Sequence, residues 1–348
     1  MSNNIYLELS ERSKQILKGV VETYLETGEP AGSETILKKV GIDISSASIR
    51  SILADLQKEG LLYAPHISAG RLPTDKGMRF FVDGLLEFGR LTKNEQENIE
   101  NQCRSRGSSF QEVLDEASKT ISGLSNCAGI VVAPKFQNKI KHIEFIRLST
   151  NQVMSIIASE NGLVENRILN TKNNYNNKIL KQVSNYLNSK FTGKTIDEIK
   201  ANIQEKIRNL KSELGALSSK LVQEGIVEIA PNNESPYIFL HGQSSLLEDE
   251  IVSKDLDQIR NLFDDIENKS NFLDILDNTS KSQGVQIFIG SQNFLFKHSG
   301  LSMVMAPYKN KEQKIIGAIG VVGPTRLNYA KIVPLVDYTS KVIGRMLS

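Results

Sequence analysis

Residues 45–79 read SSASIRSILADLQKEGLLYAPHISAGRLPTDKGMR, and this stretch decides the fold of the N-terminal region. Its first part spaces apolar residues at i, i+3, i+4 and i+7, which is typical of one buried face of an α-helix. Those residues are Ile49, Ile52, Leu53 and Leu56. Gly60 is expected to end this helix, because glycine often follows the last helical residue. Residues 61–66 then read as a strand, 68–70 as a turn and 71–73 as a return strand.

Two helical patterns precede this stretch. Ser10 can cap a helix that ends at Gly28, and Ser33 can cap a shorter helix that is closed by Gly41. Three helices followed by a hairpin have the layout of a winged helix-turn-helix. We predict such a domain over residues 1–90.

The outer face of the predicted helix at 46–58 carries small and polar side chains. Small residues allow a helix to approach the floor of the DNA major groove, while Ser and Arg offer hydrogen-bonding groups to base edges. A structural three-helix module with a polar hairpin is the alternative, but the basic residues that follow favour DNA. The candidate DNA-binding residues are Ser46, Ala47, Ser48, Arg50, Ser51, Lys58, His66, Ser68, Arg71, Lys76 and Arg79.

The charge of this domain argues against general affinity for nucleic acid. Residues 1–90 contain 11 Lys and Arg against 12 Asp and Glu, so the formal net charge is −1. A non-specific DNA binder is normally plainly basic. The sequence therefore favours a sequence-specific binder that needs two copies to bind tightly.

The composition of the whole chain is that of an ordinary globular protein. The 348 residues carry a formal net charge of +2, and the length indicates two or three domains. No apolar run approaches a membrane span, and the N-terminus lacks an apolar signal core. Cys103 and Cys127 are too few and too far apart for a thiol zinc site or a redox pair. A reducing, cytoplasmic setting is therefore expected.

Two blocks of the sequence resemble a known family. SSASIRSILADLQKEGLL, followed by PHISAGRLPTDKGMRFFVD, resembles the N-terminal domain of the bacterial heat-inducible transcription repressors of the HrcA family. GAIGVVGPTRLNYAKIVPLVDY, at 317–338, resembles the C-terminal segment of the same family. The resemblance is strong at both ends and loose over 172–282. The chain departs from the family at Ser51, where Asn is usual, and at Met78, where an aromatic residue is usual.

The resemblance carries expectations about fold and partners. It implies a multidomain α+β chain, in which a winged helix-turn-helix precedes a GAF-like domain interrupted by an inserted dimerising domain. It also implies a repressor of chaperone genes that binds double-stranded DNA at an inverted repeat as a homodimer. The chaperonin is the implied protein partner, and it would keep the repressor competent.

Beyond residue 90 the sequence divides into a connector, a sheet domain and an insertion. Residues 91–127 read as a helical connector with capping boxes at Thr92/Glu95 and Ser109/Glu112 and a hinge at 104–109. One α+β domain at 128–171 and 283–348, interrupted by a mostly helical insertion at 172–282, explains why the strand pattern stops and resumes. The predicted strands are 129–133, 142–148, 153–158, 163–169, 285–290, 303–308 and 314–322, and a helix containing Pro334 follows them.

The predicted insertion contains one narrow apolar seam. It follows a capping box at Thr195/Glu198, and its residues recur at steps of three and four. The seam is read equally well as an amphipathic helix lying on its own domain or as a contact between chains. Because winged DNA readers usually act as dimers, we assign it to dimerisation. The candidate dimerisation residues are Ile203, Ile207, Leu210, Leu214, Leu217 and Leu221.

The sequence contains little that indicates catalysis. Its four histidines show no metal-ligand spacing, and the glycines at 317, 320 and 323 do not form a phosphate-binding fingerprint. No enzyme activity, metal or cofactor is expected. Two hypotheses remain, a sequence-specific repressor and a regulator that senses a metabolite through its GAF-like domain.

Overall fold

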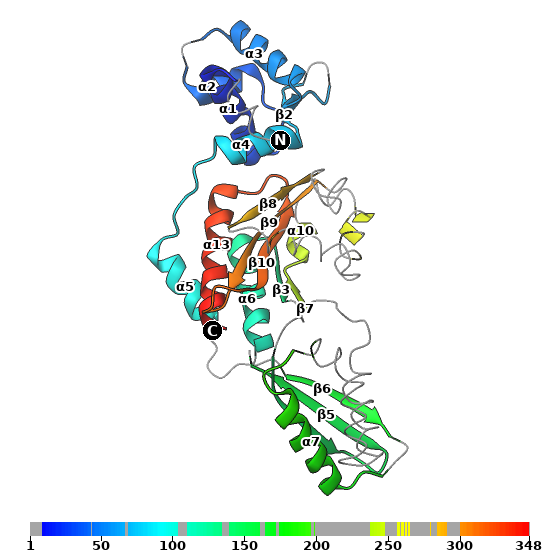
Figure 1. Ribbon diagram of the computed structural model, residues 1–348. Coiled ribbons are helices and arrows are strands. Elements are labelled where there is room, and N and C mark those ends of the chain that lie inside the picture. Colours follow the sequence, from blue (N-terminus) through cyan, green and yellow to red (C-terminus); the bar gives the residue numbers. More distant parts are fainter. Residues whose placement is uncertain are drawn as a thin grey trace.

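The computed structural model describes residues 9–42, 44–66, 69–103, 110–133, 139–160, 164–171, 174–195, 198, 237–247, 256–257, 259–260, 262, 264, 279, 284–290 and 300–347. These residues form three units, which follow one another in Figure 1. A helical unit with a small hairpin comes first, a unit built on a five-stranded sheet lies in the middle, and a three-stranded sheet with one helix lies at the far end. The chain is thus a multidomain α+β protein.

The N-terminal unit consists of four helices and a short hairpin. Its first three helices begin and end close to the positions predicted from the sequence, and Ser10 caps the first of them by accepting a hydrogen bond from the Ser13 amide. One predicted cap is wrong, because Gly32 occupies the N-cap position and Ser33 is already the first helical residue. The helices are α1 (Glu11–Thr27), α2 (Ser33–Val40), α3 (Ser46–Lys58) and α4 (Asp75–Gly84).

The hairpin is held against the helices at both ends. Its strands β1 (Leu62–Tyr63) and β2 (Leu72–Pro73) pair antiparallel, and an isolated bridge joins Ala31 to Arg71 just before β2. Thr74 then caps α4, and its amide donates to the Leu61 carbonyl at 3.0 Å. The hairpin therefore links the α1–α2 turn, the end of α3 and the start of α4.

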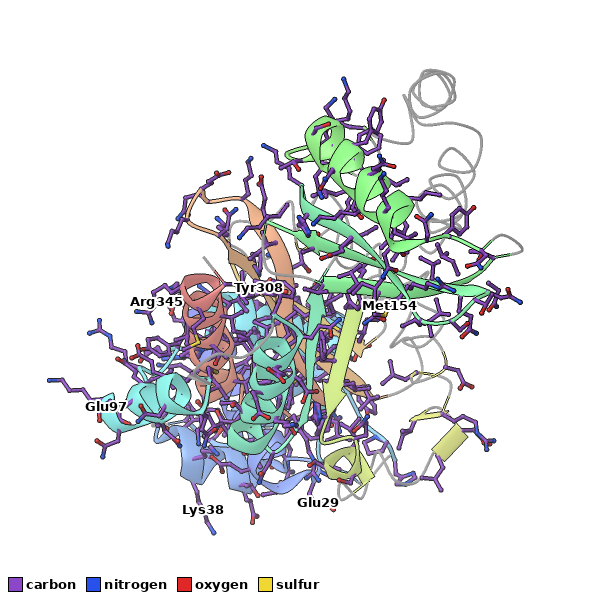
Figure 2. The ribbon with its side chains drawn as sticks, turned by 90° about the horizontal axis from the view of Figure 1, so that it is seen from below. Glu29, Lys38, Glu97, Met154, Tyr308 and Arg345 are labelled. Carbon is purple, nitrogen blue, oxygen red and sulfur yellow. The ribbon has the colours of Figure 1, made fainter. Side chains whose placement is uncertain are left out.

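The central sheet is antiparallel throughout, with strand order β7–β3–β10–β9–β8. Its middle strands are buried along nearly their whole length because both faces are covered. One face packs into the core that contains α6 and α13, and the other packs against a second cluster around Leu246 and Leu262. Figure 2 shows Tyr308 enclosed in this unit, whereas Lys38 and Glu97 extend outward. The strands are β3 (Ala128–Ala133), β7 (Tyr237–His241), β8 (Gln286–Ile289), β9 (Leu301–Lys309) and β10 (Ile315–Pro324).

Among the described residues, three longer helices and the short α10 (Ser244–Leu247) accompany this sheet. α5 (Lys93–Cys103) begins at the predicted capping box, since the Glu95 carboxylate accepts from the Thr92 amide at 2.8 Å and this bond lowers the pKa of Glu95. α6 (Phe110–Ser125) and α13 (Tyr329–Met346) both contribute to the core that covers one face of the sheet. The predicted connector is helical, but its second helix belongs to the core of the sheet unit.

The third unit corrects the predicted domain layout. Strands β4 (Ile140–Arg147), β5 (Gln152–Ser159) and β6 (Val164–Asn170) form a separate antiparallel sheet that carries α7 (Asn177–Phe191) on one face. These strands were expected to belong to the same sheet as β8, β9 and β10, and that expectation is wrong. β7, in contrast, joins the central sheet although it lies inside the predicted insertion. In β5 every second residue is buried, on the face that α7 covers, whereas the opposite face of this sheet exposes Ile146, Val164 and Ile168.

Several predicted features lie outside the described residues. They are Ser68, the hinge at 104–109, the Ser109 cap and the apolar seam with all six of its residues. The Thr195/Glu198 capping box is described and forms as predicted, because the Glu198 amide donates to Thr195 Oγ1 at 3.2 Å. No helix within the described ranges has both the length and the apolar character needed to cross a lipid bilayer.

Candidate DNA-binding surface

α3 presents a polar, solvent-facing surface on the outer side of the N-terminal unit. Ile49, Leu53 and Leu56 are buried beneath it, as the spacing predicted. Figure 1 shows α3 on the side of this unit that faces away from the central sheet. The exposed candidates on α3 are Ala47, Ser48, Arg50, Ser51 and Lys58, whereas Ser46 is half-buried. No other described element covers this face in Figure 1.

The first turn of α3 is fixed by its cap and by α2. Ser45 Oγ accepts a hydrogen bond from the Ser48 amide at 3.1 Å and lies 3.0 Å from the Ser48 hydroxyl. Arg50 Nε lies 3.4 Å from Ser33 Oγ at the start of α2, and Ser46 Oγ lies 3.3 Å from the same atom. The small serines hold the two helix starts together and leave the Arg50 side chain exposed at the edge of the face.

The basic candidates at the other end of α3 make local contacts. Lys58 Nζ lies 3.1 Å from Asp55 Oδ1, and both side chains are well exposed. Lys76 Nζ donates to the Glu59 carbonyl at 2.8 Å, so this ammonium lies at the carboxyl end of α3. His66, on the hairpin, is exposed and lies in the loop after β1. The structure therefore gathers Lys58, Lys76 and the hairpin around the end of α3.

Arg71 is partly a structural residue. Its Nη1 donates to the Ala69 carbonyl at 3.1 Å, which closes the hairpin turn, and its backbone forms the bridge to Ala31. Its Nε is buried and has no hydrogen-bond partner among the described residues. The side chain is half-buried, so only part of it faces solvent.

Arg79 does not lie with the other candidates. Its Nε pairs with Asp83 Oδ2 at 2.6 Å, and its Nη1 donates to the carbonyl oxygen of Ile287 in β8. The residue therefore faces the central sheet, because the helical turn of α4 that carries it is the one packed against β8. Sequence reasoning placed Arg79 in the hairpin's basic group, since the contact with residue 287 has no local signal in the sequence.

The described residues include one grouping that resembles a catalytic triad. His241 Nδ1 lies 2.6 Å from Ser118 Oγ, and its Nε2 lies 3.4 Å from Asp115 Oδ1. Ser118 is completely buried in α6, and its hydroxyl also donates to the Asp115 carbonyl. A substrate cannot reach this hydroxyl, so the grouping links α6 to β7 and does not form a nucleophile. Within the described part of the chain no three His, Cys, Asp or Glu are placed to hold a metal ion.

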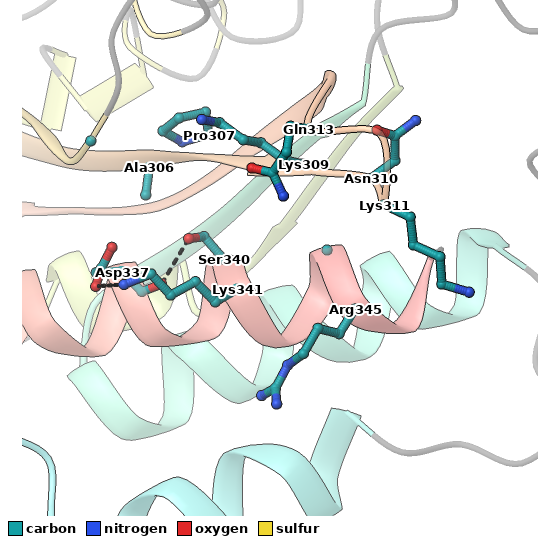
Figure 3. Close-up of a pocket in the computed structure, with 12 residues that line it drawn as sticks. Ala306, Pro307, Lys309, Asn310, Lys311, Gln313, Asp337, Ser340, Lys341 and Arg345 are labelled. Carbon is teal, nitrogen blue, oxygen red and sulfur yellow. Dashed lines mark hydrogen bonds and ion pairs between the residues drawn. The ribbon is translucent and has the colours of Figure 1, made fainter.

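A cavity of about 470 Å³ lies between the β9–β10 hairpin and α13. Figure 3 shows Lys309, Asn310, Lys311 and Gln313 on the hairpin wall and Lys341 on the helix wall. Lys341 is engaged by Asp337 at 2.6 Å. The volume falls in the range of small-molecule sites, and the lysines would favour an anion. Sequence reasoning identified no residue of this cavity, because its walls are brought together only by the tertiary fold.

Comparison with known proteins decides the family. A family model described as the HrcA protein C-terminal domain matches residues 111–333. The chain belongs to the HrcA family. It is 42% identical over 344 residues to the heat-inducible transcription repressor HrcA of Agrobacterium fabrum, covering 97% of this chain and 95% of the relative. It is 43% identical over 341 residues to the HrcA repressor of Caulobacter vibrioides, covering 98% and 95%. Membership in HrcA makes the chain a heat-inducible transcription repressor and not an enzyme, as predicted.

A solved structure supports the fold of this HrcA chain as a whole. The crystal structure of a hypothetical protein at 2.2 Å resolution superposes with a TM-score of 0.65. The alignment covers 97% of this chain and 98% of the other, at 22% sequence identity. Since the match spans the full length, the succession of units is shared between the two proteins.

Proposed function

We propose that this HrcA protein represses transcription by inserting α3 into the major groove of an operator, with the β1–β2 hairpin acting as the wing. The observation that carries the proposal is the outward face of α3, where small and hydrogen-bonding side chains lie over a buried apolar stripe. Arg50 and Ser51 would contact base edges. Lys76 and Arg71, beside the end of α3 and in the wing, would contact phosphates and fix the register.

We further propose that the operator is an inverted repeat upstream of chaperone genes and that a dimer binds it. Dimeric winged-helix proteins with two-fold symmetry bind two DNA half-sites whose centres lie about one helical turn of DNA, or a multiple of it, apart. The formal charge of −1 over residues 1–90 supports this, because one such unit has little general attraction for DNA. Gel-shift titration of the full chain and of the fragment 1–90 on the organism's chaperone promoters tests the proposal. The full chain should bind far more tightly, and equal affinity for the two would refute the need for a dimer.

The dimer contact is assigned to the apolar seam at 203–221. A charge buried in an apolar contact has no partner and is strongly unfavourable, so Leu210→Asp or Leu214→Asp should weaken the dimer. Light scattering of each variant and of Lys211→Asp, which changes a neighbouring polar position, provides the test. If the dimers of the leucine variants are as stable as those of the wild type, the alternative is favoured, in which the seam belongs to a helix that packs on its own domain.

The chaperonin is the proposed partner that keeps the repressor active. The predicted insertion is joined to the rest of the chain by polar segments such as the Asn- and Lys-rich residues 170–178, and domains joined in this way tend to move relative to one another. A loss of about 1–2 kcal/mol sharply raises the non-native fraction of a marginally stable protein. Competing unfolded clients at high temperature would withdraw the chaperonin and lower repression. The test is operator binding by purified repressor with and without chaperonin and nucleotide after a heat pulse. Full recovery without chaperonin would refute this role.

A metabolite-sensing function is the second candidate, and the cavity beside α13 is the observation that favours it. In this alternative the central unit is a GAF-like sensor and the cavity binds an organic anion. A thermal-shift screen of small anionic metabolites, run beside the gel shift, tests it. Lys309→Gln should abolish any stabilisation, while Lys314→Gln, on the same hairpin but outside the cavity lining, should not. An absence of stabilisation by every anion would rule this candidate out.

A further inference from the structure

The N-terminal unit contacts the central unit through α4. The Arg79 guanidinium bridges the two, since it pairs with Asp83 on its own helix and donates to the Ile287 carbonyl in β8. The chain that leaves α4 is fixed as well, because the Gly89 amide donates to the Ala330 carbonyl at the start of α13 with a length of 3.0 Å. We call this set of interactions the α4–β8 contact.

Two glycines show how closely the two units approach at this contact. A Cβ atom placed on Gly290, at the end of β8, would lie 2.5 Å from the carboxylate oxygens of Asp75 in α4. A Cβ atom placed on Gly28, at the end of α1, would lie 2.8 Å from the guanidinium of Arg326. Both glycines have positive φ, of +46° and +73°, a backbone conformation that favours glycine. The N-terminal and central units therefore approach each other closely at two points, between Asp75 and Gly290 and between Gly28 and Arg326.

α4 is also joined firmly to the end of α3. The Thr74 hydroxyl donates to the Gly60 carbonyl at 2.7 Å, and Lys76 Nζ donates to the Glu59 carbonyl at 2.8 Å. Gly77 packs so closely on the Leu61 carbonyl that any side chain there would overlap it. Because these bonds run from the start of α4 to the end of α3, a rotation of α4 against the central sheet would carry α3 with it.

We propose that Arg79 is a positioning residue that sets the direction of α3 relative to the rest of the chain. The proposal rests on the proposed function, in which a dimer reads two half-sites. In a dimer that self-associates through residues outside the N-terminal unit, the α4–β8 contact is the joint on which the distance between the two α3 helices depends. Arg79 then determines which half-site spacing the repressor accepts, although it touches no base.

The experiment compares operators that differ only in spacing. The DNAs are synthetic inverted repeats with the natural spacing, with one base pair removed and with one base pair added. Each is titrated with the wild-type protein, with Arg79→Gln and with the matched control Arg12→Gln, which lies on the exposed start of α1. Affinity for a single half-site, measured at low salt where binding by one unit is strongest, reports whether the N-terminal unit is intact. We expect wild type and Arg12→Gln to prefer the natural spacing about tenfold or more, and Arg79→Gln to lose most of that preference while keeping half-site affinity.

The possible results separate a failure of the positioning role of Arg79 from a failure of the proposed function. An unchanged spacing preference in Arg79→Gln overturns the positioning role while leaving the proposed function intact. A wild-type protein that binds no inverted repeat overturns the proposed function itself. Should Arg79→Gln also lose half-site affinity, the variant Asp83→Asn decides by the same criterion. It keeps the Arg79 guanidinium and removes the carboxylate charge that pairs with it. Its spacing preference should fall as well, and a preference equal to that of wild type overturns the inference.

Discussion

Two serine caps in the N-terminal unit make a matched pair for testing α3. Ser45 accepts from the Ser48 amide at 3.1 Å at the start of α3, and Ser10 accepts from the Ser13 amide at 3.2 Å at the start of α1. Each capping hydroxyl also lies about 3 Å from the hydroxyl of the serine three residues on. Replacing a serine N-cap by alanine costs about 1 kcal/mol. Ser45→Ala and Ser10→Ala should therefore lower the free energy of unfolding by similar amounts.

Their effects on DNA binding should differ. A domain with 5–15 kcal/mol of stability stays almost fully folded after losing about 1 kcal/mol, so Ser10→Ala should leave operator affinity unchanged. Ser45→Ala frays the turn that carries Ala47 and Ser48, and ordering this turn on DNA then costs up to the same 1 kcal/mol, or about fivefold in Kd. Fluorescence anisotropy with a labelled operator, beside urea denaturation of both variants, measures the two quantities. Equal Kd values for two equally destabilised variants would refute the placement of this turn in the DNA interface.

Three further predictions follow from the same surface and from the core. Arg50→Ala should reduce the free energy of operator binding by about 1–3 kcal/mol and relax the sequence preference at one base pair. The control Lys38→Ala, on the exposed side of α2, should do neither. Equal losses of affinity for operator and random DNA would refute a base contact by Arg50. Lys76→Gln should weaken binding to all DNA sequences alike and reduce the slope of log K against log salt concentration by about one. An unchanged slope would contradict a phosphate contact. Burial raises the pKa of the Cys103 and Cys127 thiols to about 11. The folded state therefore keeps protons that the unfolded state releases, and thermal denaturation should show stability falling as pH rises from about 9 towards 11, while a flat profile would contradict it.

Local rules predicted the N-terminal unit well. The Ser10 cap and the Thr92/Glu95 box depend on residues three apart, so their signals are present in the sequence itself. The buried stripe of α3 likewise follows from a period of 3.6 residues. Arg79 was misplaced for the opposite reason, because its partner carbonyl is 208 residues away and is a backbone atom that no side-chain pattern marks.

The strands that the sequence predicted lie close to their expected positions, but β7 was missed and the grouping of the strands into sheets was wrong. Buried residues alternate with more exposed ones along β5, as expected for a sheet covered on one face, whereas β3 is buried at every residue because a core cluster packs on each of its faces. That difference between alternating and continuous apolar patterns is the signal that separates the two sheets. β7 was missed because its five residues, YIFLH, form a short apolar run that periodicity alone cannot assign.

The central claim is that α3 reads an inverted repeat in the organism's own chaperone promoters. Hydroxyl-radical footprinting of the full-length protein on these promoters tests it most directly. Our account predicts two symmetric protected half-sites separated by about one or more helical turns, both lost in Arg50→Ala at a concentration that protects them in Lys38→Ala. Protection of one continuous patch without symmetry, or protection that survives in Arg50→Ala, would contradict the assignment of α3 as the reading helix.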